Sequence, residues 1–202
     1  MFVQRAAIRP VPTYAVVSRG AVATVESELE SAGNEERAVL DRAYRTLDRE
    51  QPVVARYLEE TLGSRYDEHA LGLGYYLGLA VFMSFREAFP TRLGRVSDAL
   101  LEAEEAALAA DEEMRAEHPS EVVDSDDVLA MEQPAILELI HRHVEAVLEQ
   151  SASKELEAPA EGIDLDEVDA IYRALLVQVL ALSRAVAPPP GTSQDAGPEV
   201  LA

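Results

Sequence analysis

The sequence predicts an all-α protein, a helical bundle of about seven helices with flexible N- and C-terminal tails. Apolar residues recur at helical spacing from residue 34 to residue 187. Proline and glycine separate these periodic stretches, as they do between the helices of a bundle. The uncharged run 70–85 is shorter than the roughly 20 residues that a membrane-spanning helix needs. We therefore expect it to be the buried central helix, and we expect no membrane span.

The two ends of the chain lack the helical pattern. Residues 1–33 contain two prolines and two glycines without a helical period, which predicts a flexible N-terminal segment. Within it, Thr13–Val17 and Ala21–Val25 are short apolar runs that could pair as a hairpin. Residues 188–202 begin with three prolines and continue with serine, glycine and aspartate, which predicts a disordered tail.

The predicted helical domain covers residues 34–187, and its first half, residues 34–90, holds three helices. The first helix ends near Asp48. Pro52 suits the first turn of a second, short helix, because its missing N–H needs no partner there. The third helix, about residues 66–89, contains two glycines one turn apart, Gly74 and Gly78. This spacing allows a neighbouring helix to approach closely.

A connector helix is predicted over residues 91–118, followed by a second half over residues 120–187. The acids of the connector are expected to face solvent. Its inner stripe is expected to consist of Leu93, Val96, Leu100, Ala103, Ala107 and Met114. The second half repeats the order of the first, with a short helix around Leu129, a medium helix after Pro134 and an apolar helix from Asp164.

The tripeptide Glu-Gln-Pro occurs twice, at residues 50–52 and 132–134, and precedes a helical pattern each time. Together with the matching helix order, it indicates an internal duplication in which the apolar helices of two three-helix halves pack against each other. Glutamine is not a preferred N-cap. The amides of Gln51 and Gln133 therefore either satisfy neighbouring backbone groups or contact a ligand or partner.

One helical face of the second half carries the residue types of a metal site. Glu138, His141 and Glu145 share this face, and Glu-x-x-His is half of the ligand set of a carboxylate-bridged dimetal bundle. No second Glu-x-x-His occurs in the chain. We therefore expect a charged surface here, with these three residues as metal candidates and no cofactor.

Two adjacent tyrosines form the other candidate site. Tyr75 and Tyr76 are about 100° apart around the apolar helix, so one ring can be buried while the other faces solvent or a pocket between the halves. Filling of the core explains the rings as well. We keep both as candidate ligand or partner contacts, because an interface between two halves suits a small ligand.

The net charge of −21 limits the choice of partner. It opposes binding to nucleic-acid phosphates and to anionic membranes, so we expect no direct nucleic-acid binding. A protein partner, basic or apolar, is expected instead. The absence of cysteine excludes disulfides and thiolate metal sites, and it fits a reducing compartment, which predicts the cytoplasm.

No catalytic set is evident in the sequence, so the leading hypothesis is a non-enzymatic acidic interaction or adaptor protein. Two alternatives stay open. One is a small-molecule or metal-dependent enzyme with a pocket near Tyr75, Tyr76, Glu138 and His141. The other is a DNA mimic, whose acids occupy the phosphate site of a basic DNA-binding protein.

Overall fold

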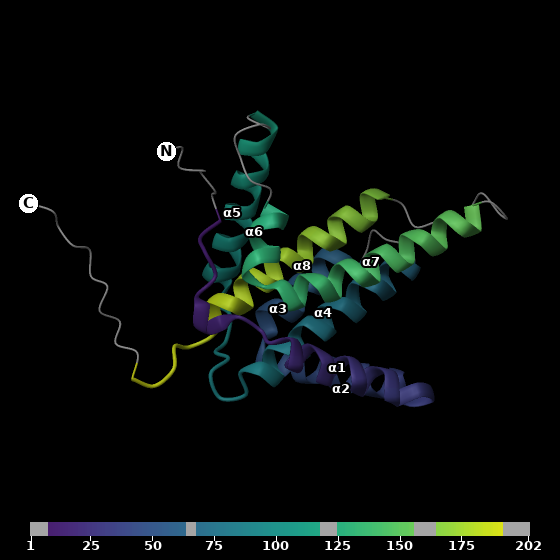
Figure 1. The fold of residues 1–202 in the computed structure, drawn as a ribbon, viewed down its shortest axis with the longest axis horizontal. Coiled ribbons are helices and arrows are strands. Elements are labelled where there is room, and N and C mark those ends of the chain that lie inside the picture. Colours follow the sequence, from purple (N-terminus) through teal and green to yellow (C-terminus); the bar gives the residue numbers. More distant parts are fainter. Residues whose placement is uncertain (1–7, 64–67, 118–124, 156–164, 192–202) are drawn as a thin grey trace, which may run out of the picture.

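The all-α prediction is confirmed by the computed structural model, which describes residues 8–63, 68–117, 125–155 and 165–191 (Figure 1). In these residues the chain forms α-helices and no strand. The helices are α1 (Arg19–Ala32), α2 (Glu36–Glu50), α3 (Pro52–Leu62), α4 (Glu68–Ala88), α5 (Asp98–Glu117), α6 (Ser125–Glu132), α7 (Pro134–Glu155) and α8 (Leu165–Ala185). Single 3-10 turns, Thr13–Ala15 and Gly33–Glu35, precede α1 and α2.

The core lies around α4 and α8, two apolar helices that pack against each other. Helices α1, α2 and α7 contact α4, α5 contacts α8, and α3 contacts both. In Figure 1, α1 and α2 lie below this centre, and α5 and α6 project from its upper left. The long apolar run of α4 is therefore covered by other helices of the same chain, as a buried core helix requires.

The hairpin predicted near the N-terminus is wrong, because residues 8–33 form no strand. The run Ala21–Val25 lies inside α1, whose N-cap Ser18 accepts a hydrogen bond from the Ala21 N–H at 3.2 Å. The buried residues of α1 repeat at helical spacing and are Ala21, Val22, Val25 and Leu29. The segment before α1 also packs on the core through Ile8, Val11, Ala15 and Val17. Residues 1–7 and the predicted tail 192–202 lie outside the described residues.

The predicted connector helix begins later than expected and buries a different face. Residues 89–97 are not α-helical, and α5 starts at Asp98. Its buried residues are Leu101, Glu104, Leu108 and Asp111, instead of the predicted alanine-containing stripe. Glu104 forms ion pairs with Arg9 at 2.9 Å and with Arg184 at 3.4 Å. The arginines offset the cost of burying this carboxylate, which the sequence pattern alone placed in solvent.

The predicted close helix approach at two glycines of α4 is confirmed. A Cβ atom on Gly78 would lie 3.0 Å from Leu58 Cδ1 of α3 and 3.5 Å from Gln178 Oε1 of α8. One on Gly74 would lie 2.9 Å from Leu62 Cδ1. The Gln178 Nε2 donates to the Gly78 carbonyl oxygen at 2.8 Å. The missing side chain at Gly78 thus lets α8 bind the backbone of α4.

A buried glutamine fixes the segment that enters α5. Gln51, between α2 and α3, is 2% exposed. Its Nε2 donates to the Gly94 carbonyl oxygen at 2.7 Å, and its Oε1 accepts from the Val96 N–H at 2.9 Å. Ser97 then caps α5 by accepting from the Leu100 N–H at 3.2 Å. The carboxamide satisfies two backbone groups of an extended segment, as a neighbouring strand would.

Gln133 makes the same contacts with the segment that enters α1. It is fully buried between α6 and α7. Its Nε2 donates to the Ala15 carbonyl oxygen at 2.8 Å, and its Oε1 accepts from the Val17 N–H at 2.9 Å. The Nε2 also donates to the Ser183 hydroxyl oxygen of α8 at 3.0 Å. We call the contacts of Gln51 and of Gln133 the glutamine clamps.

Each glutamine clamp reaches outside the predicted half that contains its glutamine. Gln51 precedes α3 but holds the entry to α5, and Gln133 precedes α7 but holds the entry to α1. The packed helix pairs correspond in the same way, because α1 contacts α4 and α7 while α5 contacts α8 and α3. The internal duplication stays a prediction. These contacts favour halves of four helices, α1 to α4 and α5 to α8, over three helices and a connector.

Replacing Gln133 with leucine should destabilise the protein by about 2 kcal/mol or more, because two buried backbone groups lose their partners at about 1–3 kcal/mol each. Gln51→Leu should have a similar effect. Urea unfolding followed by circular dichroism measures the free energy of unfolding. The control Glu113→Leu, at an exposed position of α5, should change it by less than about 0.5 kcal/mol. Equal stabilities of the clamp variants and the control would contradict the role of the clamps.

Candidate functional site

The structure places Gln51 and Gln133 in the interior, where the glutamine clamps use both polar atoms of each amide. Neither amide is presented at the surface. Of the two roles that the sequence left open, the hydrogen bonds support the structural one. We therefore do not include these residues in the candidate site.

The three metal candidates of α7 have separate surroundings. Glu138 forms an ion pair with Arg19 of α1 at 2.8 Å. The His141 Nε2 lies 2.7 Å from the Tyr172 hydroxyl oxygen of α8, and the two rings stack. Glu145 is exposed. Among the described residues, no group of three His, Asp or Glu side chains is placed to hold a metal ion, so the geometry gives the metal hypothesis no support.

Tyr75 and Tyr76 contact different helices, as their angular separation predicts. The Tyr75 ring meets Tyr44 of α2 edge-on, with the ring centroids 6.4 Å apart. The Tyr76 ring lies against His143 of α7, with the centroids 5.2 Å apart. Both tyrosines are half-buried. Tyr75, Tyr76, Glu138 and His141 each contact a different residue, and a pocket shared by them stays a prediction.

Tyr44 retains its proton to an unusually high pH. Its hydroxyl donates to the carboxylate of Glu59 on α3. This hydrogen bond, with partial burial and the negative charge of Glu59, raises the pKa of Tyr44 from 10.0 to about 12. The contact joins α2 to α3 beside the Tyr75 ring.

Tyr76 lies among carboxylates. Burial raises the pKa of Tyr76, and the charges of Glu36, Glu26 and Glu30 raise it further, whereas Arg142 lowers it. Glu26 is already paired with Arg142. Glu30 and Glu36 form no ion pair within the described part of the chain. The charge near the Tyr76 ring is therefore negative.

His143 has one ring nitrogen fixed by the backbone. Its Nδ1 lies 2.9 Å from the Leu139 carbonyl oxygen. Since a carbonyl oxygen can only accept, Nδ1 carries the proton in this contact. The Nε2 of the neutral ring is then able to accept a hydrogen bond from another group.

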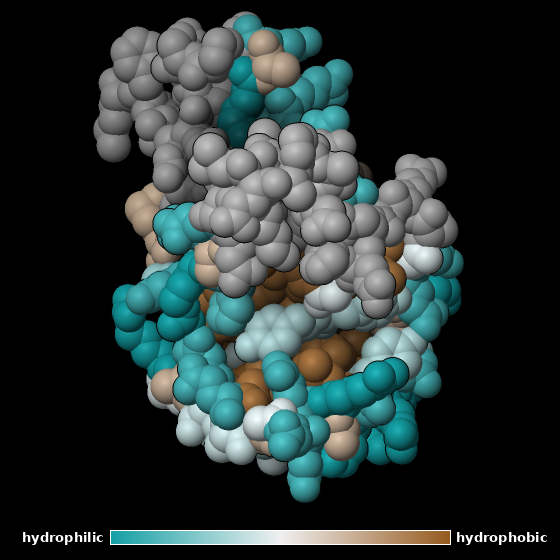
Figure 2. Space-filling view, turned by 90° about the vertical axis from the view of Figure 1, so that its right-hand side faces the viewer, coloured by the Kyte–Doolittle hydropathy of each residue, from teal (hydrophilic) through white to brown (hydrophobic). Residues whose placement is uncertain are grey.

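Figure 2 views the end of the bundle at which α1 ends and α2 begins. Hydrophobic surface is visible there in a hollow, with hydrophilic residues below it and to its sides. The charges of Glu30, in the last turn of α1, and of Glu36, the first residue of α2, act on the Tyr76 hydroxyl. We call the group formed by Tyr76, His143, Glu26, Glu30 and Glu36 the acidic hollow.

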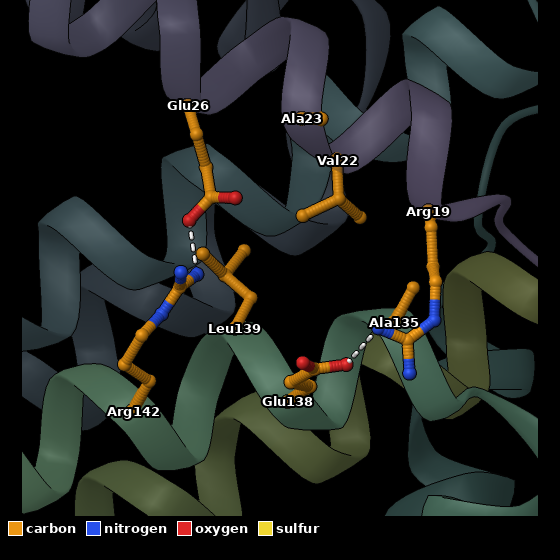
Figure 3. A pocket seen from close by; sticks show the side chains of 8 residues that line it. All are labelled: Arg19, Val22, Ala23, Glu26, Ala135, Glu138, Leu139 and Arg142. Atoms are coloured by element: carbon orange, nitrogen blue, oxygen red, sulfur yellow. Dashed lines mark hydrogen bonds and ion pairs between the residues drawn. The ribbon is translucent and has the colours of Figure 1, made fainter.

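A cavity of about 200 Å³ lies between α1 and α7 (Figure 3). Two ion pairs span it, Arg19 with Glu138 at one end and Arg142 with Glu26 at the other. The remaining lining residues are apolar and are Val22, Ala23, Ala135 and Leu139. Because the charges neutralise each other, a charged ligand would first have to break one of these pairs. The two ion pairs therefore join α1 to α7, and every charged residue that lines the cavity has an ion-pair partner.

The sequence analysis missed the contribution of α1 to the site. It assigned residues 21–25 to a strand, so Glu26 and Glu30 belonged to no helix face. The pattern that predicts this helix is Ser18 as N-cap, followed by apolar residues at helical spacing. For His143 the sequence gives no such indication, because its contact with Tyr76 joins residues far apart in the chain.

Comparisons of the chain with models of protein families, with curated proteins and with solved structures found no match. None of the helices in the described residues is both long and apolar enough to cross a bilayer. The fold and the site define a helical bundle with an acidic, aromatic hollow at one end. Its function is therefore argued from this geometry.

Replacing Glu59 with glutamine should lower the pKa of Tyr44 from about 12 toward 10.0, because the negative acceptor is lost. Spectrophotometric titration of the tyrosines at alkaline pH measures this change, and Tyr44→Phe identifies the signal. The folded protein keeps this proton to a higher pH than the unfolded chain does. The contribution to stability is therefore complete below the unfolded pKa and is lost as the pH rises through the folded pKa. An unchanged titration in Glu59→Gln, as expected for the control Glu60→Gln, would refute this assignment.

Proposed function

We propose that the protein is a non-enzymatic interaction or adaptor protein that binds a basic protein partner. The observation that carries the proposal is the acidic hollow, which combines exposed apolar surface with carboxylates that have no ion pair among the described residues. Protein-binding surfaces combine an apolar centre with a polar rim in this way. Charge on the rim increases the association rate and selects among partners.

The use of the arginines supports the proposal. The chain has 38 acidic residues and 17 lysines and arginines, so most acids cannot be neutralised internally. Most described arginines are already paired within the chain, and these are Arg9, Arg19, Arg49, Arg56, Arg86, Arg115, Arg142, Arg173 and Arg184. The excess acids produce a long-range field that attracts a basic partner.

The same charge opposes direct binding to nucleic acids, which require cationic surface. The absence of cysteine fits a reducing compartment, and the proposal places the protein in the cytoplasm. The enzyme alternative has no specific observation in its favour, because its four residues contact four different neighbours.

Affinity capture from a native lysate tests the proposal, with the full chain immobilised and an unrelated protein of similar acidity as the control bait. We expect a basic protein to be captured at low salt and released at high salt, because exposed charges are screened. Mass spectrometry identifies it, and the sequence of the captured protein gives its charge. The proposal fails when neither salt condition yields a protein specific to this bait. Release of the captured protein by DNA would favour the alternative function, a DNA mimic, over an adaptor.

A further inference from the structure

We propose that the acidic hollow is the docking site for a basic amphipathic helix of the partner, with an arginine of that helix lying over the Tyr76 ring. This inference rests on the proposed function. It adds the position of the binding site on the bundle and the chemistry of the residue that anchors the partner.

Helices α1, α2, α4 and α7 each carry apolar side chains that are only partly buried. The half-buried apolar residues of these helices that pack on the core include Ala32, Leu40, Leu71, Val144 and Val147. Figure 2 shows hydrophobic surface exposed in the hollow. An amphipathic helix binds such a surface by placing its apolar face in the groove.

Charge complementarity requires the helix to be basic. Glu30 and Glu36 are exposed and form no ion pair among the described residues, and both lie close enough to influence the Tyr76 hydroxyl. Glu26 shares its charge with Arg142. A cation in the hollow therefore gains attraction from two unpaired carboxylates, whereas a cation at the α1–α7 cavity would compete with arginines that are already bound.

The aromatic ring and the histidine favour arginine over lysine. A guanidinium group stacks on an aromatic face and is more weakly hydrated than an ammonium group. The Tyr76 ring is half-buried and supported by His143, whose ring is tilted 42° to it. In the tautomer with the proton on Nδ1, the Nε2 of His143 can accept one guanidinium N–H, while the carboxylates accept others. An ammonium group lacks the planar donor arrangement that matches these acceptors.

Synthetic peptides provide the test. Three peptides of one length carry the same leucine face and bear arginine, lysine or glutamate on the polar face. Fluorescence anisotropy of each labelled peptide with the full chain gives its Kd. We expect the arginine peptide to bind most tightly, the lysine peptide more weakly and the glutamate peptide not at all. Equal binding of the arginine and lysine peptides would overturn the arginine anchor.

Substitution of Tyr76 locates the anchor. Tyr76→Leu should weaken binding of the arginine peptide by about fivefold to thirtyfold, because it removes the aromatic face and keeps an apolar side chain. Tyr76→Phe should retain the affinity. The matched control is Tyr14→Leu, which replaces an exposed tyrosine on another segment. Circular dichroism verifies that each variant is folded.

Substitution of the two unpaired acids tests the charge. Glu30→Gln combined with Glu36→Gln should weaken binding about tenfold at low salt and reduce its dependence on salt. The control removes the same charge elsewhere, by Glu102→Gln with Glu113→Gln on the exposed face of α5. Equal losses in the two double variants would show that the net charge, and not the hollow, binds the peptide.

The outcomes separate this inference from the proposed function. If Tyr76→Leu binds the arginine peptide like the wild type, the docking site is wrong, although a basic partner captured from the lysate still supports the function. If the wild-type chain does not bind the arginine peptide but does bind the captured partner, this inference alone is overturned. If no basic partner is captured and no basic peptide binds, both are overturned.

Discussion

Two buried glutamine amides hold the backbone that leads into α1 and α5, and the arrangement of the bundle depends on them. An extended segment inside a protein must find partners for its N–H and C=O groups, and this protein has no sheet in its described residues to provide them. Each carboxamide supplies one donor and one acceptor at the spacing of two residues. These contacts set where α1 and α5 start and therefore how they cover α4 and α8.

The distribution of charge follows from the same packing. Glu104 faces the core because Arg9 and Arg184 meet it there, and Arg19 and Arg142 neutralise acids between α1 and α7. Within the described segments, the acids left without such partners include Glu30 and Glu36. The negative charge of the protein is therefore distributed unevenly over its surface. The surface that can attract a partner depends on which arginines already form ion pairs within the chain.

The sequence predicted most of the helices and the close packing at Gly78, because both depend on local spacing and on residue size. The prediction from sequence failed where one stretch of residues fits two patterns. Ala21 to Val25 fits a short strand as well as a turn of helix, and the Ser18 cap decides between them. The start of α5 and the burial of Glu104 could not be predicted, because Gln51 and Arg184 act on them from distant parts of the chain. The contact between Tyr76 and His143 is unpredictable for the same reason.

The crossing of the glutamine clamps has a consequence for how the protein opens. When the second half unfolds, Gln51 of the first half loses the partners that it has there. When the N-terminal segment detaches, Gln133 of the second half loses the partners that it has in this segment. Partial opening therefore leaves a buried amide unsatisfied in the part that remains folded, which makes partly unfolded states costly. The backbone N–H groups of Val17 and Val96 each donate a hydrogen bond to a glutamine of the opposite half. Their exchange with solvent should require the opening of the whole bundle, so the two halves form one cooperative thermodynamic unit.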